Sequence, residues 1–439
     1  MSARTCDPSR RAFLGGGLGL AFTTCLGGHT SRAHAAPPPA APVIALVGAE
    51  LHVGDGAVIK DAVVTVIGET IADVGGPDRR ARLPAGAAVV DLAGKLLTPG
   101  FIAADTALGL VEIDLEPSTR DDSLGVGDPV HAAYDAAAAL QAGSSLIQVQ
   151  AIEGITSAAV TPGGGFLSGQ VAWIDLVHGD RERMLVRPRI AARGALGQAY
   201  AGSRAATLAK LREVLADARL YRARRGDHER AQLRELAAHP RDLEALFPVL
   251  DRKVPLVLAA ERESDIAAAV DLAREEKLRI TLVGAGEAWK LARRLADAKI
   301  PVIVQPTSNL PGSLDSLGAR LDNAALLADA GVDVAIATFG APHNLRNVAQ
   351  EAGIAVANGL AWERALTATT LAVARAYGME ASHGSVSRGK VANLVVWDHD
   401  PFELSSFPRQ VYIRGQAIPM VSRQTLLRER YRDPARPRR

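Results

Sequence analysis

Between residues 43 and 92 the chain carries short apolar or alternating runs that are separated by turn residues. Gly54-Asp55-Gly56 and Gly75-Gly76-Pro77 are two of these turns, because glycine and proline supply the backbone angles that tight turns need. Several short strands at this spacing are typical of a small β-sandwich or open barrel. The pattern predicts strands at residues 43–47, 50–53, 62–67, 70–74 and 88–92.

From residue 101 the pattern changes to apolar runs that alternate with amphipathic stretches. Such alternation over residues 99–385 predicts an α/β fold, a (β/α)₈ TIM-type barrel, and the length is close to the roughly 250 residues typical of that barrel. The segment 203–245, rich in Arg, Glu and Ala, is predicted to be a solvated helical excursion. The predicted barrel strands are 101–104, 155–160, 254–259, 279–283, 301–304 and 332–337, and the predicted helices are 129–141, 205–224, 242–247, 264–275, 287–295, 318–330 and 361–376.

Strand-like runs return after the barrel pattern, at residues 390–398 and 410–413. The last residues, 421–439, are rich in arginine and contain two prolines. A loosely ordered, solvated end is the expectation for such a tail.

The composition is that of a globular protein, with 48% apolar and 22% charged residues among 439. This length is sufficient for a large barrel and a smaller domain. The formal net charge of +2 gives no strong field that would attract nucleic acid, so a nucleic-acid partner is not expected.

The first residues have the pattern of an export signal. Ser9-Arg10-Arg11-Ala12-Phe13-Leu14 opens an uncharged, weakly hydrophobic run, and Ala33-His34-Ala35 offers a cleavage site between small residues. Twin arginines with these features are typical of Tat export, which predicts that residues 1–35 are removed and that the protein is periplasmic. Residues 36–42, rich in proline, are predicted to be a linker.

Two other interpretations of this segment are a membrane anchor and a lipoprotein signal. The apolar run is shorter than the roughly 20 residues that span a bilayer, so no membrane span is expected after cleavage. In a lipoprotein signal the lipid would be attached at Cys25, but the preceding residues Phe22-Thr23-Thr24 match such a signal poorly. Cys6 and Cys25 would leave with the signal, so the mature chain would have no disulfide, thiolate metal site or cysteine nucleophile.

The junction into the barrel resembles a known family. Pro99-Gly100-Phe101-Ile102 with Asp105-Thr106-Ala107 is similar to the Pro-Gly-x-Ile-Asp-x-His-x-His junction of the amidohydrolase superfamily. Gly389-Lys390-Val391-Ala392-Asn393-Leu394-Val395-Val396 resembles that family's C-terminal return, with Asn393 in place of the usual aspartate. Gly154-Ile155-Thr156-Ser157 and Ala365-Leu366-Thr367-Ala368 are similar to its imidazolonepropionase-like branch.

The resemblance implies an architecture and a reaction class. It implies that residues 43–98 and 386–420 form one composite β-sandwich domain from both chain ends, beside a barrel at 99–385. It also implies hydrolysis of C–N bonds in amides, cyclic amides or peptides. Oligomers are common in the family, so a homodimer or a heteromer with a paralogue is a further expectation.

The family's metal ligands do not have counterparts here. They are a histidine pair on barrel strand one, histidines on strands five and six, and an aspartate on strand eight, which suit Zn²⁺. The residues at those places are Asp105 and Ala107, Ala259 and Glu261, Gly284, and Phe339 or Gly340. No cofactor is therefore predicted, although the family would use zinc.

Several polar residues remain where the barrel mouth is expected. Asp105, Glu261, Glu287 and His343 are the candidate catalytic residues, since carboxylates and a histidine can act as general acid and base without metal. The carboxylates could instead bind Ca²⁺ or Mg²⁺, or serve in ion pairs and at helix N-termini. Gln170 and Gln305 are the candidate substrate-binding residues.

Two nearby loops have both a functional and a structural interpretation. Residues 108–123 are rich in acidic side chains and could bind a cationic substrate or form a solvated loop. Pro162-Gly163-Gly164-Gly165 could present backbone N–H groups to an anion or form a tight turn.

Two hypotheses of function follow. The first is an exported hydrolase of C–N bonds with a rearranged or metal-free site. The second is a non-catalytic homologue that binds a small-molecule ligand or serves as partner subunit of an active paralogue.

Overall fold

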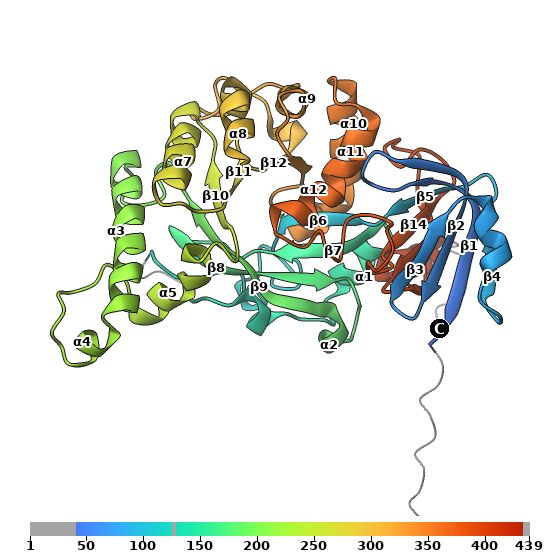
Figure 1. The fold of residues 1–439 in the computed structure, drawn as a ribbon, viewed down its shortest axis with the longest axis horizontal. Coiled ribbons are helices and arrows are strands. Elements are labelled where there is room, and N and C mark those ends of the chain that lie inside the picture. The colour runs from blue at the N-terminus through green and yellow to red at the C-terminus, as the bar shows by residue number, and fades with distance from the viewer. Residues whose placement is uncertain (1–40, 125–128, 433–439) are drawn as a thin grey trace, which may run out of the picture. The chain divides into compact units, whose positions relative to one another are not determined.

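Two hydrogen-bonded sheets of eight strands each organise the chain (Figure 1). The computed structural model describes residues 41–124 and 129–432. The predicted signal peptide at 1–35, most of the linker and residues 433–439 lie outside the described residues. The predicted domain boundaries stay predictions.

The first sheet takes strands from both ends of the chain. β5 lies between β1 and β14, parallel to the former and antiparallel to the latter. The hydrogen bonds join all its strands into one sheet, so the predicted sandwich of two sheets is not confirmed. Its strands are β1 (Val43–His52), β2 (Val58–Ile67), β3 (Thr70–Gly75), β4 (Ala88–Asp91), β5 (Leu96–Pro99), β14 (Leu394–Trp397), β15 (Pro408–Ile413) and β16 (Gln416–Ala417).

The bend of β1 explains how one strand serves several neighbours. Its register with β2 shifts between Val47 and Ala49, where Gly48 has a φ of 90°. A side chain would be strained at that angle, so glycine is required there. β4 pairs with β1 before this point and β5 pairs with it afterwards, which extends the sheet around the bend.

The second sheet forms a nearly closed barrel whose strands follow chain order. It is not a regular (β/α)₈ barrel, because β8 runs antiparallel to both of its neighbours. The loop from β7 to β8, residues 161–166, is shorter than the dozen or more residues that a parallel crossover needs. The strands are β6 (Phe101–Thr106), β7 (Ile155–Val160), β8 (Leu167–Asp175), β9 (Leu185–Ala195), β10 (Leu256–Ala260), β11 (Ile280–Gly284), β12 (Val302–Val304) and β13 (Val334–Ile336).

Helices cover the outside of this sheet (Figure 1). The prediction of a helix at 205–224 is confirmed by α3, and that at 264–275 by α7. The predicted helix at 361–376 is broken at Thr370 into two. The larger helices are α1 (Ser145–Ala151), α3 (Arg204–Ala223), α7 (Glu263–Glu275), α8 (Ala292–Ala298), α9 (Asn323–Asp329), α10 (Val348–Ala357), α11 (Trp362–Thr369) and α12 (Leu371–Ala376).

The prediction of a helix at 129–141 is wrong. Only a short 3-10 turn forms there, at Ala136–Ala139, with the Asp135 side chain accepting a hydrogen bond from the N–H of Ala137. The backbone of Asp135 pairs instead with Gln170 of β8. This alanine-rich stretch therefore serves as an extra edge along the barrel, and tertiary pairing outweighs helix propensity.

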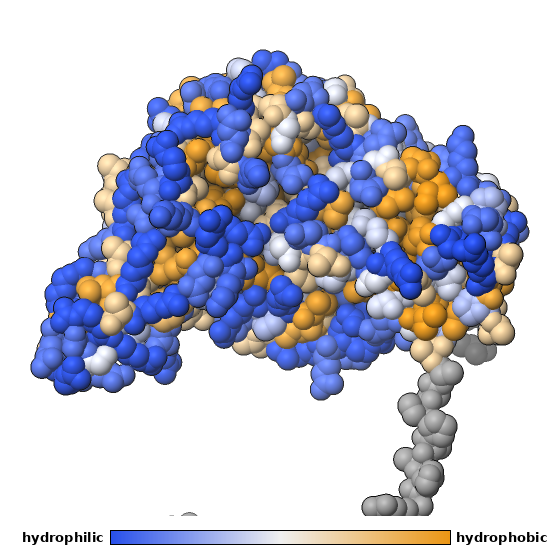
Figure 2. All heavy atoms as spheres, viewed as in Figure 1, coloured by the Kyte–Doolittle hydropathy of each residue, from blue (hydrophilic) through white to orange (hydrophobic). Residues whose placement is uncertain are grey.

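The excursion after β9 consists of α3 and the short helices α4 (Arg225–Glu229) and α5 (Pro240–Ala245). Figure 2 shows a largely hydrophilic surface over this part of the view, as predicted for a solvated excursion. The tail differs from its prediction, because residues Arg423–Arg432 form the helix α13, none of whose side chains is buried. Among the described residues, none of the helices has the length and apolarity needed to cross a bilayer.

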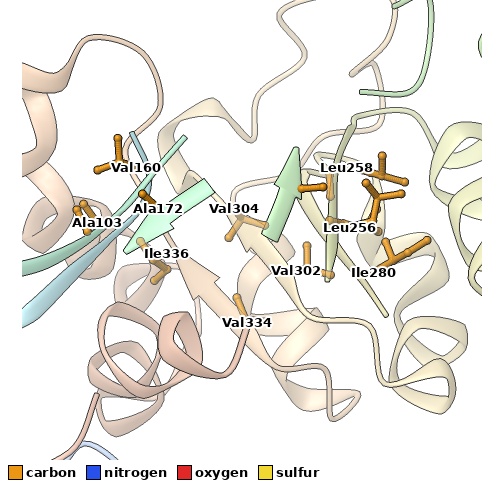
Figure 3. Packing of buried hydrophobic residues seen from close by; sticks show 14 of the residues in the cluster. Ala103, Val160, Ala172, Leu256, Leu258, Ile280, Val302, Val304, Val334 and Ile336 are labelled. Atoms are coloured by element: carbon orange, nitrogen blue, oxygen red, sulfur yellow. The ribbon is translucent and has the colours of Figure 1, made fainter. Parts of the chain in front are cut away.

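Alternate strand residues pack on the two faces of the barrel sheet. One set packs against the outer helices, and Figure 3 shows members such as Leu258, Val304 and Ile336. The other set, including Val257 and Ile303, fills the barrel interior together with residues of α12. A residue just past the end of a strand that continues this inward-facing alternation therefore points into the mouth of the barrel.

A buried polar cluster joins the barrel to the first sheet. The Asp175 carboxylate, at the end of β8, accepts hydrogen bonds from Ser157 Oγ at 2.8 Å and Asn393 Nδ2 at 2.9 Å. It also lies 3.0 Å from Arg414 Nη1 and 3.2 Å from His383 Nε2. An aspartate at position 393 would place a second carboxylate beside Asp175, which explains why asparagine suits this position.

Candidate active site

A cavity of about 300 Å³ lies at the C-terminal ends of the barrel strands, and we call it the mouth cavity. Barrels of this type carry their chemistry at this end. Its polar lining consists of Asp105, Thr106, Asp122, Thr161, Arg193 and Glu261, and its remaining lining is formed by Ala107, Pro162, Gly163, Ala259, Val283, Gly284, Phe339 and Gly340.

Asp105 reaches the cavity because of a β-bulge. Ala104 packs in the barrel interior, so in a regular strand the next residue would face the outer helices. The pairing of β6 with β7 shifts between Ala103 and Thr106, which gives β6 one residue more than its partner. The bulge turns Asp105 inward.

Arg193 on β9 is the partner of Asp105. Its Nη2 lies 3.2 Å from Asp105 Oδ2, and its Nη1 donates to the carbonyl of Gly194 at 2.9 Å. Both side chains are largely buried, with 13% and 11% of their areas exposed. Among the described residues these two contacts use two of the five N–H groups that an Arg side chain carries.

Glu261, just past β10, lies against Gly284, the last residue of β11, and Gly286, two residues beyond it. Its Oε2 accepts a hydrogen bond from the N–H of Gly286 at 3.0 Å. An ideal Cβ at Gly284 would lie 1.9 Å from Glu261 Oε1, so the carboxylate fills the space where a side chain at position 284 would begin. Glu261 as a residue is exposed, but partial desolvation of its carboxyl raises its pKa, with Asp315 adding to the rise and the Gly286 hydrogen bond opposing it.

Glu287 does not line the mouth cavity. Its Oε2 accepts from the N–H of Glu263 at 3.0 Å and its Oε1 from the N–H of Gly318 at 2.7 Å. Burial alone would raise its pKa, but these hydrogen bonds and Lys290, 3.1 Å away, hold the pKa below the ordinary value. The carboxylate thus caps the start of α7 and anchors the loop before α9.

Gln305 supports the mouth without lining it. Its Oε1 accepts from the N–H of Phe339 at 2.8 Å, and its Nε2 donates to Glu351 Oε1 at 2.8 Å. This amide joins the ends of β12 and β13 and fixes Phe339, which does line the cavity.

Gln170 and His343 lie away from the mouth cavity. The Nε2 of Gln170 donates to the carbonyl of Ala132 at 2.7 Å, so the buried amide holds the edge segment against β8. His343 is exposed, and its backbone carbonyl accepts from Gln150. Of the six candidates, the structure brings only Asp105 and Glu261 into one cavity.

The two loops have mainly structural contacts. In the acidic loop, the Glu112 carboxylate accepts hydrogen bonds from the hydroxyls of Ser144 and Ser145. Burial alone would raise the pKa of Glu112, but these hydrogen bonds lower it. In the glycine run, the Gly163 N–H donates to the carbonyl of Asp122 at 2.7 Å. That N–H is thus already used and does not await an anion.

Arg193 and Tyr377 are the residues that sequence reasoning missed. Arg193 belongs to a strand that was not predicted, and its place two residues after Ala191, which packs in the barrel interior, puts its side chain on the inward face. The Tyr377 hydroxyl donates to the carbonyl of Ala104, beside Asp105. Burial, with the Asp105 charge nearby, raises the pKa of Tyr377 well above its ordinary range and keeps the hydroxyl protonated.

Known proteins share this architecture. A family model described as "Amidohydrolase family" matches residues 259–418. The imidazolonepropionase of Pseudomonas paraeruginosa (strain DSM 24068 / PA7) is 27% identical over 381 residues, covering 81% of this chain and 92% of that protein. The amidohydrolase from Thermotoga maritima MSB8 superposes with a TM-score of 0.76 at 26% identity, covering 85% of this chain and 99% of that one. The chain belongs to the amidohydrolase superfamily.

Other similarities are more limited. Amidohydrolase tasK of Hapsidospora irregularis is 38% identical over 74 residues, which is 17% of this chain and 8% of that protein. A prolidase complexed with N-methylphosphonate-L-proline has a TM-score of 0.53 at 17% identity, which shows a shared fold alone.

The mouth cavity is lined by the carboxylates of Asp105 and Glu261 together with Gly284. Across residues 41–124 and 129–432, no three or more His, Cys, Asp or Glu side chains are grouped so that they could hold a metal ion.

Proposed function

We propose that this chain hydrolyses a C–N bond of a small amide or cyclic amide in the mouth cavity, with Glu261 as general base. The observation that carries the proposal is that Glu261, whose pKa is raised, and the guanidinium of Arg193 line the same cavity. A carboxylate with a raised pKa is a stronger base near neutral pH. The likeness to an imidazolonepropionase supports the reaction class.

In the proposed reaction the Glu261 carboxylate removes a proton from water, and the hydroxide adds to the carbonyl carbon. The carbonyl oxygen becomes an oxyanion, which the Arg193 guanidinium stabilises. Protonated Glu261 then donates its proton to the leaving nitrogen as the C–N bond breaks. Asp105 holds Arg193 in position throughout, so it acts as a positioning residue.

The residues present do not fit the binuclear metal centre of the family. Ala107 and Ala259 offer no ligand atoms, and Asp105 is already engaged by Arg193. Glu261 fills the space where a ligand at position 284 would begin. The proposal therefore includes no step through a metal ion.

The test is turnover of N-acyl amino acids, dipeptides and cyclic amides by purified protein. We expect Glu261→Gln to lower kcat at least about 100-fold, the usual loss when a general base is removed. Glu182→Gln is the matched control, because Glu182 is exposed on α2 (Arg181–Met184) and lies outside the cavity. Turnover that persists in Glu261→Gln and depends on added zinc would contradict the proposal.

Binding of these compounds without turnover by the native protein would instead support a non-catalytic homologue that binds ligands or assists an active paralogue. Isothermal titration calorimetry on the same compounds separates the two outcomes.

We further propose export to the periplasm, supported by Arg10-Arg11 and the Ala33-His34-Ala35 site. Changing both arginines to lysine should leave the protein in the cytoplasmic fraction, whereas unchanged fractionation would contradict Tat export.

A further inference from the structure

A second and larger cavity lies at the opposite end of the barrel. It has a volume of about 800 Å³ and is lined by residues at the N-terminal ends of β10 to β13, such as Pro255, Ile280, Pro301 and Asp333. We call it the basal cavity. Function in barrel enzymes is concentrated at the other end, so a residue pattern on this face needs its own explanation.

Positive charge dominates the basal cavity. Seven cationic and two acidic side chains line it. Arg274 and Arg294 share one carboxylate, Asp271, and Arg375 pairs with Asp333 at 3.2 Å. The other four cations have no ion-pair partner among the residues that the structure describes, and they are Arg252, Lys277, Arg279 and Lys299.

Three of these unpaired cations occupy backbone positions that favour glycine. Arg252, Lys277 and Lys299 have φ values of 61°, 55° and 53°. Each lies at the turn that ends a helix and leads into the next barrel strand. A side chain in this left-handed conformation is unfavourable, and helices commonly end on glycine for this reason.

The next helix-to-strand turn of the barrel has glycine at the corresponding position. Gly331, between α9 and β13, has a φ of 88° and fills the corresponding position with glycine. Three consecutive turns of the same barrel thus keep a long cation where glycine would be less strained. Cations near helix C-termini also complement the helix dipole, which is the competing explanation.

The floor of the cavity is apolar. Val270, Leu278, Ile280 and Ala376 are buried there, whereas Arg252, Lys277 and Lys299 are exposed. Its volume lies within the range of small-molecule sites, and its concave form suits a discrete ligand better than an extended polymer. Clustered Arg and Lys side chains are the usual partners of phosphate groups.

We propose that the basal cavity binds a small anion carrying two or more phosphate groups. Such a ligand neutralises the unpaired cations that surround the apolar floor. The site is separate from the mouth cavity, so it does not depend on the proposed hydrolase activity.

The test is calorimetric titration of the full-length protein with inorganic tripolyphosphate at about 0.15 M salt. We expect saturable binding by the native protein, and at least tenfold weaker binding by the double variant Lys277→Gly, Lys299→Gly. Because glycine relieves the left-handed strain, the melting temperature of this variant should stay the same or rise. Arg279→Gln, which alters a half-buried cation of the same cavity, should also weaken binding.

The matched control is Lys60→Gln with Arg388→Gln, which removes the same charge from two exposed cations outside the cavity. Its affinity should change less than twofold. Absence of saturable binding by the native protein, or equal weakening in the control, would overturn the proposal. A lower melting temperature with unchanged binding would favour the helix-dipole explanation and also overturn it.

A second arm distinguishes a free anion from a lipid headgroup. Vesicles of phosphatidylcholine with one quarter phosphatidylglycerol are sedimented with the protein. We expect no cosedimentation beyond that of pure phosphatidylcholine vesicles. Vesicle binding that tripolyphosphate does not displace would overturn the assignment to a small free ligand.

Discussion

The carboxylate of Glu261 fills the space above the Cα atom of Gly284, where an ideal Cβ would lie only 1.9 Å from Glu261 Oε1. A side chain on β11 and the present position of Glu261 are therefore mutually exclusive. The N–H of Gly286 donates a hydrogen bond to the carboxylate and holds it in this position.

Gly284→Ala should destabilise the fold by about 2–3 kcal/mol, since left-handed strain costs about 1–2 kcal/mol and displacing the flexible end of Glu261 loses its hydrogen bond to Gly286, about 1 kcal/mol. In a Glu261→Ala background the clash is absent, so only about 1–2 kcal/mol of backbone strain should remain. Urea unfolding of the four proteins measures this difference. Equal losses in both backgrounds would show that the two residues do not compete for space.

Arg193→Met should cost about 2–4 kcal/mol, because it leaves the largely buried carboxylate of Asp105 without its partner. Adding Asp105→Asn should recover at least half of the loss. The control is Arg189→Met on the same strand, whose ion pair with Asp135 is exposed and should be worth less than about 1 kcal/mol. Equal effects of the two Arg variants would contradict a buried, coupled pair.

The raised pKa of Glu261 gives a pH dependence with a definite sign. The folded state holds this proton more tightly than the unfolded chain, so the stability that Glu261 contributes is full below the unfolded pKa, roughly 4.3, and is lost as pH rises through the folded pKa. Glu261→Gln should therefore gain stability relative to the native protein as pH rises from about 4 through the folded pKa. Denaturant unfolding across this range would contradict the assignment if the difference stayed constant.

Glu287 should show the opposite sign, because its folded pKa is lowered. Its contribution is present above the unfolded pKa of roughly 4.3 and is lost as pH falls through the folded value. The deficit of Glu287→Gln should be largest near neutral pH and should shrink in acid. Chemical unfolding at pH 3, 5 and 7 checks this, and a deficit that grew in acid would refute the capping role.

Part of this architecture could be predicted from the sequence because it depends on local runs of apolar residues and on turn residues. The apolar runs at 101–104 and 155–160 correspond to β6 and β7, and the turn chemistry marked the entry into the barrel. β8 and β9 were missed, since β8 is buried along its whole length and β9 carries Pro188 and several arginines. Neither strand shows the simple alternation that identifies a half-buried strand.

The site was less predictable because its contacts join distant residues. Asp105 could be named from the resemblance, but its partner Arg193 lies 88 positions away. The bulge that turns Asp105 inward depends on the register with β7. Glu287 was expected at the mouth from its place after β11, yet the nearby backbone N–H groups turn its carboxylate toward α7.

The position of β5 between β1 and β14 imposes an order on folding during synthesis. β5 ends at Pro99 and β14 begins at Leu394, so the ribosome must add nearly 300 residues before β5 can gain its second neighbour. At about 5–20 residues per second this interval lasts roughly 15–60 s. Until then β5 presents an unpaired edge that is open to pairing with another chain.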